Sequence, residues 1–112
     1  MKTDYITFDT ILPPYLAYPQ FLLGMNLRLI AKEVYVILLD MTMSRKGSVD
    51  EHGIQYLTFS NPEIAKLIDR TPSTVGQAMA ELEAVGLVER HLVSRIQPYH
   101  TYVKLPAAEN EL

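Results

Sequence analysis

The amino-acid sequence predicts a mainly helical α+β domain, organised as a winged helix-turn-helix with a C-terminal β-hairpin wing. Three observations support this prediction. Residues 27–43 repeat apolar side chains at helical spacing, two helix-start signals follow close together at Ser60 and Thr71, and two strand-like segments lie at 87–93 and 99–105. A helix, a strand, two helices joined by a short turn and a final hairpin are the elements of a winged helix, in that order.

Length and composition indicate a single globular domain. The chain has 112 residues, of which 48% are hydrophobic and 21% charged. A chain of this size buries roughly 65% of its unfolded surface and can fold without disulfides or metals. The absence of cysteine excludes a disulfide framework and cysteine-based zinc sites. We divide the chain into an N-terminal arm (1–26), a winged-helix domain (27–105) and a tail or linker start (106–112).

No segment has the layout of a membrane span or a signal peptide. The longest apolar run is interrupted by Lys32, Glu33 and Asp40, and the first residues include Asp4 and Asp9. We therefore expect a cytoplasmic protein without membrane contact.

The arm has prolines and many large apolar side chains. Pro13, Pro14 and Pro19 interrupt any helix there. The large apolar residues of the arm are Tyr5, Phe8, Ile11, Leu12, Tyr15, Tyr18 and Phe21. Two alternatives remain open: the arm packs across the core of its own domain, or it packs on a partner chain.

The first long helix is expected over 27–43, with Asn26 as its cap. Its apolar positions are Ile30, Val34, Ile37, Leu38 and Met41, widened by Tyr35 and Leu39. A polar loop is expected at 44–54. Its consecutive Asp50, Glu51 and His52 do not converge on one ion, so we expect a solvated turn and no metal. A short strand is expected at 55–59.

Two helix starts then define the helix-turn-helix. Ser60 with Glu63 matches a capping box, and Asn61 followed by Pro62 matches proline at the first helical position. This helix carries Ile64, Ala65, Leu67 and Ile68 and ends near Arg70. Thr71-Pro72 repeats the signal, and the second helix is expected over 72–85, with Gly86 closing it in a left-handed conformation.

The second of these helices has a core face and an opposite face of small or polar residues. The predicted core face carries Val75, Met79, Leu82 and Gly86, and the far face carries Ser73, Gln77, Ala80 and Ala84, flanked by Thr74 and Gly76. In winged helices such a helix lies in the DNA major groove, and its free N–H groups suit a phosphate. Each residue alone is better explained by capping or solvation than by DNA contact, so the prediction depends on the combination. The predicted recognition residues are Thr71, Ser73, Thr74, Gln77 and Ala80.

The DNA-backbone and wing contacts predicted from charge are Lys66, Arg70, Arg90, His91, Arg95 and His100. Net charge is −3 and the isoelectric point about 5.5. Five basic residues between 59 and 104 are balanced by five acidic ones: Glu63, Asp69, Glu81, Glu83 and Glu89. We place Glu81 on the helix flank and Glu83 partly toward the core. Binding by one copy should be modest and should fall steeply with salt, so a dimer or an array of sites is needed for tight binding.

Two segments carry a family resemblance. The run AKEVYVILLDMTMSRKGSVDEHGIQYLTFS (31–60) resembles the N-terminal domain of the RepA-type plasmid replication initiators, and STVGQAMAELEAVGLVER (73–90) is similar to the family's second motif. The resemblance covers about residues 8–104. It implies a winged helix that binds repeated double-stranded DNA sites at a plasmid or conjugative-element origin, usually as a homodimer. It also implies that host replication proteins are recruited by a second domain, which we expect to be missing from this chain.

Two other functions remain open. The domain could be a winged-helix transcriptional regulator, or a protein-interaction module that does not bind DNA. An enzyme is not expected, because His52, His91 and His100 have no serine or cysteine nucleophile constellation and the chain has no GxxxxGK[ST] phosphate loop. No cofactor is expected.

Overall fold

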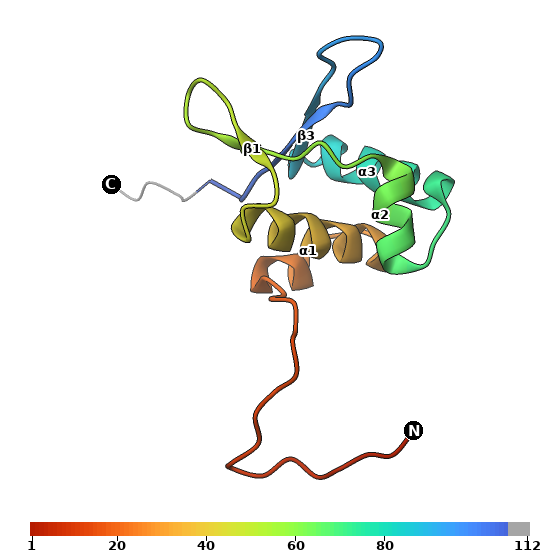
Figure 1. The fold of residues 1–112 in the computed structure, drawn as a ribbon. Coiled ribbons are helices and arrows are strands. Elements are labelled where there is room, and N and C mark those ends of the chain that lie inside the picture. Colours follow the sequence, from red (N-terminus) through yellow and green to blue (C-terminus); the bar gives the residue numbers. More distant parts are fainter. Residues whose placement is uncertain (108–112) are drawn as a thin grey trace.

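The computed structural model describes residues 1–107 and contains three α-helices and two short β-hairpins (Figure 1). A 3-10 helix, Gln20–Gly24, precedes the domain. The remaining elements are α1 (Leu29–Met43), β1 (Ser48–Val49), β2 (Gln55–Tyr56), α2 (Asn61–Ile68), α3 (Pro72–Ala84), β3 (Val88–His91) and β4 (His100–Val103). Both hairpins project from the same side of the helices. The predicted fold class, a mainly helical α+β winged helix-turn-helix, is confirmed.

One hydrophobic core joins the three helices to the base of the wing. Its buried members include Val34 and Leu38 of α1, Ile64 of α2, and Val75 and Leu82 of α3, each at most 1% exposed. The predicted core positions Met41 and Met79 are also buried, whereas Ile30 and Ile37 are half-buried. Ala78 is buried although it was not predicted, and Gly86, placed on the core face by the helical wheel, is exposed.

The polar loop predicted at 44–54 is partly wrong, because it contains strand β1. Ser48 pairs with Tyr56 and Val49 with Gln55. Glycine at 47 permits this pairing, since a Cβ at Gly47 would lie 2.0 Å from the Tyr56 carbonyl oxygen. The strand predicted at 55–59 accordingly ends early, at Tyr56.

The two hairpins are joined through the residue that follows β2. Leu57 and Thr101 of β4 exchange two backbone hydrogen bonds, each 2.8 Å long. In the wing itself, Val88 pairs with Val103 and His91 with His100. The wing is therefore hydrogen-bonded to the body of the domain along β4.

The first helix begins later than predicted. Arg28, not Asn26, is the N-cap, and it makes no side-chain cap hydrogen bond. Instead its backbone N–H and its guanidinium both donate to the Glu81 carboxylate on α3, the former at 3.1 Å. These contacts, the backbone N–H first, hold the pKa of Glu81 below its usual value. A tertiary contact thus replaces the local cap.

The N-terminal arm does not pack across the core over residues 1–18, so the first of the two alternatives is wrong there. All eighteen positions are exposed, and the segment runs away from the helices (Figure 1). Only the 3-10 helix docks: Leu22 is fully buried, and the Phe21 ring meets the Tyr35 ring edge-on with centroids 5.7 Å apart. The prolines did not exclude this short helix, because it begins directly after Pro19.

Local signals set the helix-turn-helix as predicted. The Ser60 hydroxyl accepts from the Glu63 N–H at 3.3 Å, and the Glu63 carboxylate accepts from the Ser60 N–H at 3.1 Å, which completes the capping box. α2 ends at Ile68, two residues before the predicted end, because Asp69 takes a left-handed conformation with φ of 53°. Gly86 closes α3 with φ of 83°.

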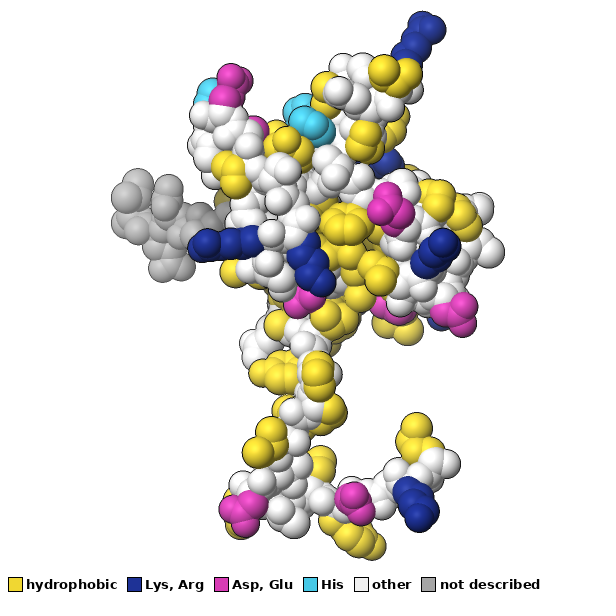
Figure 2. Space-filling model, viewed as in Figure 1, with side chains coloured by type: hydrophobic (Ala, Val, Ile, Leu, Met, Phe, Trp, Pro, Cys, Tyr) yellow, Lys and Arg dark blue, Asp and Glu magenta, His cyan; other side chains and the backbone are white. Residues whose placement is uncertain are grey.

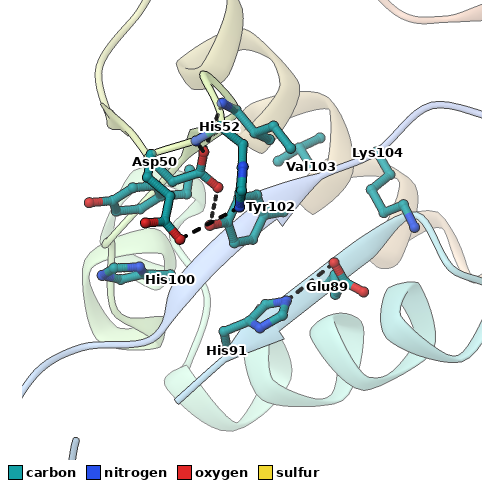
Figure 3. A pocket seen from close by; sticks show the side chains of 11 residues that line it. Asp50, His52, Glu89, His91, His100, Tyr102, Val103 and Lys104 are labelled. Atoms are coloured by element: carbon teal, nitrogen blue, oxygen red, sulfur yellow. Dashed lines mark hydrogen bonds and ion pairs between the residues drawn. The ribbon is translucent and has the colours of Figure 1, made fainter. Parts of the chain in front are cut away.

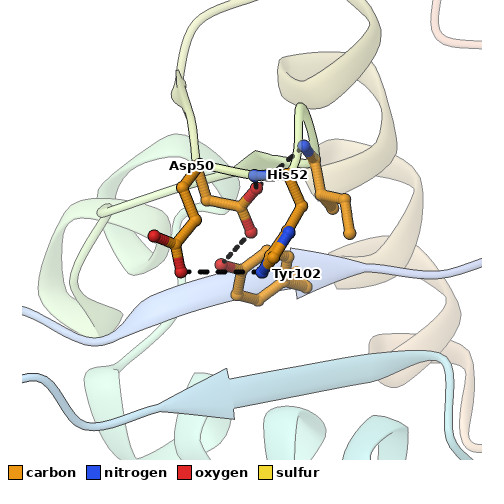
Figure 4. A network of polar contacts seen from close by, with 5 residues as sticks. Asp50, His52 and Tyr102 are labelled. Carbon is orange, nitrogen blue, oxygen red and sulfur yellow. Dashed lines mark hydrogen bonds and ion pairs between the residues drawn. The ribbon is translucent and has the colours of Figure 1, made fainter.

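Asp50 connects the first hairpin to the wing (Figure 4). One carboxylate oxygen accepts from the N–H groups of His52 and Ile54 at 2.8 and 3.0 Å, and the other accepts from the Tyr102 hydroxyl at 2.9 Å. Beside it, the Tyr56 and His100 rings stack with centroids 3.9 Å apart. The turn that follows Asp50 is exposed, as expected, whereas Asp50 itself is half-buried and its carboxylate is held by three donors.

Replacing Ser60 with alanine should lower the free energy of unfolding by about 1 kcal/mol, because the Glu63 N–H at the start of α2 loses its acceptor. Urea denaturation measures the change. Thr58→Ala is the matched control, since Thr58 is exposed and lies just outside the helix. Equal losses in the two variants would contradict a capping role for Ser60.

Replacing Asp50 with asparagine should produce a pH-dependent loss of stability. The Ile54 N–H first, then the Tyr102 hydroxyl and the His52 N–H, lower the pKa of Asp50. Its stabilisation is therefore complete above the unfolded pKa of about 4 and is lost as pH falls through the lower folded value. The difference in the free energy of unfolding between the wild type and Asp50→Asn, measured by urea denaturation, should shrink as pH falls from about 5 to about 2. The same is not expected for Glu51→Gln. A constant Asp50→Asn difference would refute this linkage.

Candidate nucleic-acid interface

The start of α3 presents an exposed face made of small and polar side chains. Ser73, Gln77 and Ala80 are exposed, while Val75 and Met79 on the opposite side are buried in the core. The residues just before, Thr71 and Pro72, are exposed as well. The first turn of the helix therefore offers its free N–H groups and the positive end of its dipole at the surface.

The two threonines of this region form the helix cap. The Thr71 hydroxyl accepts from the Thr74 N–H at 3.2 Å, and the two hydroxyl oxygens are 3.0 Å apart. Thr74 is half-buried. Its hydroxyl and that of Thr71 are thus engaged with each other, and Ser73 is the exposed hydroxyl of the first turn.

Gly76 belongs to the contact between α2 and α3. It is half-buried, and a Cβ at this position would lie 3.5 Å from the Asn61 amide nitrogen at the start of α2. This is an ordinary contact distance, so crowding does not require glycine there. The small residues of α3 that remain on the exposed face are Ser73, Ala80 and Ala84.

Two predicted backbone contacts lie beside the start of α3. Lys66 is exposed on α2, and Arg70 is exposed in the turn between α2 and α3. Neither takes part in an ion pair within residues 1–107. Both charges are free to meet a phosphate next to the helix.

The wing has two faces, because residues alternate across a β-ladder. Arg90 and Thr101 are paired and face α3, whereas Glu89 with Tyr102, and His91 with His100, face the first hairpin. This alternation places the Arg90 side chain on the opposite face of the wing from His91 and His100.

His91 and His100 line a groove of about 730 Å³ between the two hairpins (Figure 3). Its walls also carry the carboxylates of Asp50, Glu51 and Glu89, and His91 Nε2 lies 3.2 Å from a Glu89 oxygen. All three histidines of the chain line this groove. Within residues 1–107, however, no group of three or more histidine and carboxylate side chains is arranged to hold a metal ion. The three carboxylates, offset in part by Lys104 of the same groove, oppose a phosphate at this face.

The two arginines of the wing differ in their surroundings. The Arg90 side chain is 18% exposed, its Nη1 lies 4.0 Å from a Glu83 oxygen, and its guanidinium lies 4.3 Å from the centre of the Tyr99 ring. Arg95 is exposed in the loop at 92–99, and Figure 2 shows a basic side chain at the tip of this hairpin. Arg95 is therefore the wing arginine that a DNA backbone can reach directly.

The acidic residues of α3 are tied to neighbouring elements. Glu81 binds Arg28, the N-cap of α1, as described above. Glu83 was expected partly toward the core, but it is exposed and lies near Arg90 of the wing. Both acids are in the second half of α3, away from its exposed start.

Comparison with known structures supports this arrangement at the level of the fold. A structure described as the N-terminal domain of a DNA-binding protein aligns with a TM-score of 0.74 and 20% identity, over 96% of this chain and 88% of that one. A Rep–DNA complex aligns with a TM-score of 0.73 and 21% identity, over 87% and 79%. An MDR initiator aligns with a TM-score of 0.71 and 20% identity, over 86% and 80%.

Two further findings concern the chain as a whole. No helix within residues 1–107 is long and apolar enough to span a membrane. A search of curated proteins finds no significant match.

The family model for the replication initiator protein A (RepA) N-terminus matches residues 14–111. This match covers the helix-turn-helix, both hairpins and the residues that carry the resemblance found in the sequence. The chain therefore belongs to the RepA N-terminus family of replication initiators.

Proposed function

We propose that this domain binds double-stranded DNA sequence-specifically at repeated origin sites and so helps to initiate replication of a plasmid or mobile element in the cytoplasm. The observation that carries the proposal is the exposed start of α3. There Ser73, Gln77 and Ala80 face outward from a helix whose opposite side is buried. Membership in a replication initiator family supports the same function.

The exposed side chains suit a major groove. The Gln77 amide can pair with the N6 and N7 atoms of adenine, and the Ala80 methyl can meet a thymine methyl. The free N–H groups of the first turn, together with Lys66 and Arg70, suit phosphates on one side of the groove. Thr71 and Thr74 act through the cap, which keeps that turn in place.

The charge balance favours binding to several sites at once. The segment from 59 to 104 has equal numbers of basic and acidic residues, so one domain gains little from the general attraction of the phosphates. Repeated sites and a second copy of the domain would raise the overall affinity through effective concentration. We assign contact with host replication proteins to a further domain of such initiators rather than to these residues.

The direct test is fluorescence anisotropy with a labelled duplex containing direct repeats from the gene's own replicon, against a shuffled duplex, at two salt concentrations. The repeat duplex should bind more tightly at both. Equal affinity for the two duplexes would rule out sequence-specific binding.

Replacing Gln77 with alanine should relax the preference at one base pair and cost about 1–3 kcal/mol on the repeat, because the paired amide contact is lost. A competition assay with single-base variants of the repeat measures this. Ala84→Ser is a matched control on the same exposed face but in the last turn of α3. Unchanged selectivity in Gln77→Ala would place this side chain outside the groove.

The arm is proposed to bind a second copy of the chain. Within residues 1–18, Phe8 and Ile11 are 110% and 91% exposed, and Figure 2 shows apolar side chains along the whole segment. Large apolar groups left in water favour burial on a partner. The arm is therefore the surface that we assign to a homodimer.

Replacing Phe8 and Ile11 together with serine should convert a dimer to a monomer in light scattering coupled to size exclusion. Ile96→Ser is the matched control, since Ile96 is 94% exposed but lies at the wing tip. A monomeric wild type, or a dimer that survives the double substitution, would rule out the arm as the dimer surface.

A further inference from the structure

We propose that Arg90 is a positioning residue: it fixes the wing against α3 and thereby determines where Arg95 meets the DNA backbone. This inference rests on the proposed DNA binding and deepens it. It assigns to Arg90 a role different from the phosphate contact that its charge predicts.

One side chain links three segments of the fold. Arg90 lies on β3, Glu83 lies near the end of α3, and Tyr99 lies on the returning strand side of the wing loop, directly before β4. The Arg90 guanidinium lies 4.3 Å from the centre of the Tyr99 ring and 4.0 Å from a Glu83 oxygen. A planar cation can stack on an aromatic face and pair with a carboxylate at its edge at the same time.

The same geometry makes Arg90 a poor phosphate ligand. Its side chain is only 18% exposed, and its Nε is buried without a hydrogen-bond partner in the described chain. The Glu83 carboxylate offsets part of its charge. To reach a phosphate, the guanidinium would have to leave both Tyr99 and Glu83, so its contribution to binding is indirect.

The wing loop needs such an anchor because few other contacts hold it. Between His91 and His100, which close the base of the hairpin, the loop has one side-chain hydrogen bond, from the Gln97 N–H to the Ser94 hydroxyl. Its aliphatic residues Leu92, Val93 and Ile96 are exposed. Tyr99 therefore ties the loop to Arg90, and through Glu83 to α3, at the point where the loop rejoins the ladder.

The test combines a measurement without DNA and one with it. Arg90→Ala removes the cation, Arg90→Lys keeps the charge but not the planar shape, and Tyr99→Leu removes the ring. Tyr99→Phe keeps the ring and is the matched control. Without DNA, backbone ¹⁵N relaxation should show faster motion at 92–99 in the first three variants and no change in Tyr99→Phe. Thermal melting identifies any variant that fails to fold. If Arg90→Ala does not fold, Tyr99→Leu takes its place in the comparison.

With the repeat duplex, the first three variants should bind about fivefold to tenfold more weakly, and Tyr99→Phe should bind like the wild type. Adding Arg95→Ala to Arg90→Ala should lower the affinity for the duplex by a smaller factor than Arg95→Ala does in the wild type. The reason is that the displaced wing no longer holds Arg95 next to the DNA backbone.

Three results overturn the proposal. Arg90 would be a direct phosphate contact if Arg90→Lys bound the duplex with full affinity. The same would follow if the losses of binding free energy in Arg90→Ala and Arg95→Ala added up in the double variant. Unchanged relaxation at 92–99 in Arg90→Ala would exclude positioning whatever the DNA result. A wild type that binds no duplex would instead refute the proposed function, and the relaxation data would still decide the role of Arg90.

Discussion

The packing of α3 against α1 and α2 is the constraint on which the rest of the structure depends. Val75, Ala78 and Leu82 have no exposed surface, and they meet Val34 and Leu38 of α1 in the same core. Burying a valine or leucine side chain stabilises the fold by about 1.5–3 kcal/mol. Because one side of α3 is fixed in this way, the opposite side has a defined direction in space. The side chains at its start can therefore act as a fixed set.

The helices were predictable because their signals are local. A capping box, a proline at a first turn and a glycine with positive φ each act within a few residues, and each is found where the sequence places it. The start of α1 was not predictable in this way, because Arg28 is held by Glu81, which is far away in the chain. The hairpins were also less predictable: β1 depends on how closely Gly47 approaches Tyr56, and Leu57 pairs with Thr101 across 44 positions of sequence.

The candidate site also combines features that follow from local sequence with features that depend on tertiary contacts. The exposure of Ser73, Gln77 and Ala80 follows from helical periodicity, which the sequence contains. The surroundings of Arg90 do not, because a positive charge in a strand looks the same whether it meets a phosphate, a ring or a carboxylate. Its burial beside Tyr99 and Glu83 became visible only once α3 and the wing were placed together. His91 and His100 were grouped with the basic residues by composition, although strand alternation turns them to the other face.

The groove between the hairpins gives the wing an electrical polarity. Glu89 of the wing and Asp50 and Glu51 of the first hairpin line it together with Lys104, whereas Arg90 lies on the other face of the wing and Arg95 at its tip. At physiological ionic strength the field of such charges reaches about 8 Å, so the three carboxylates, offset in part by Lys104, weaken the attraction of a polyanion for the groove side. A duplex that approaches by the wing tip therefore meets less opposing charge than one that approaches by the groove.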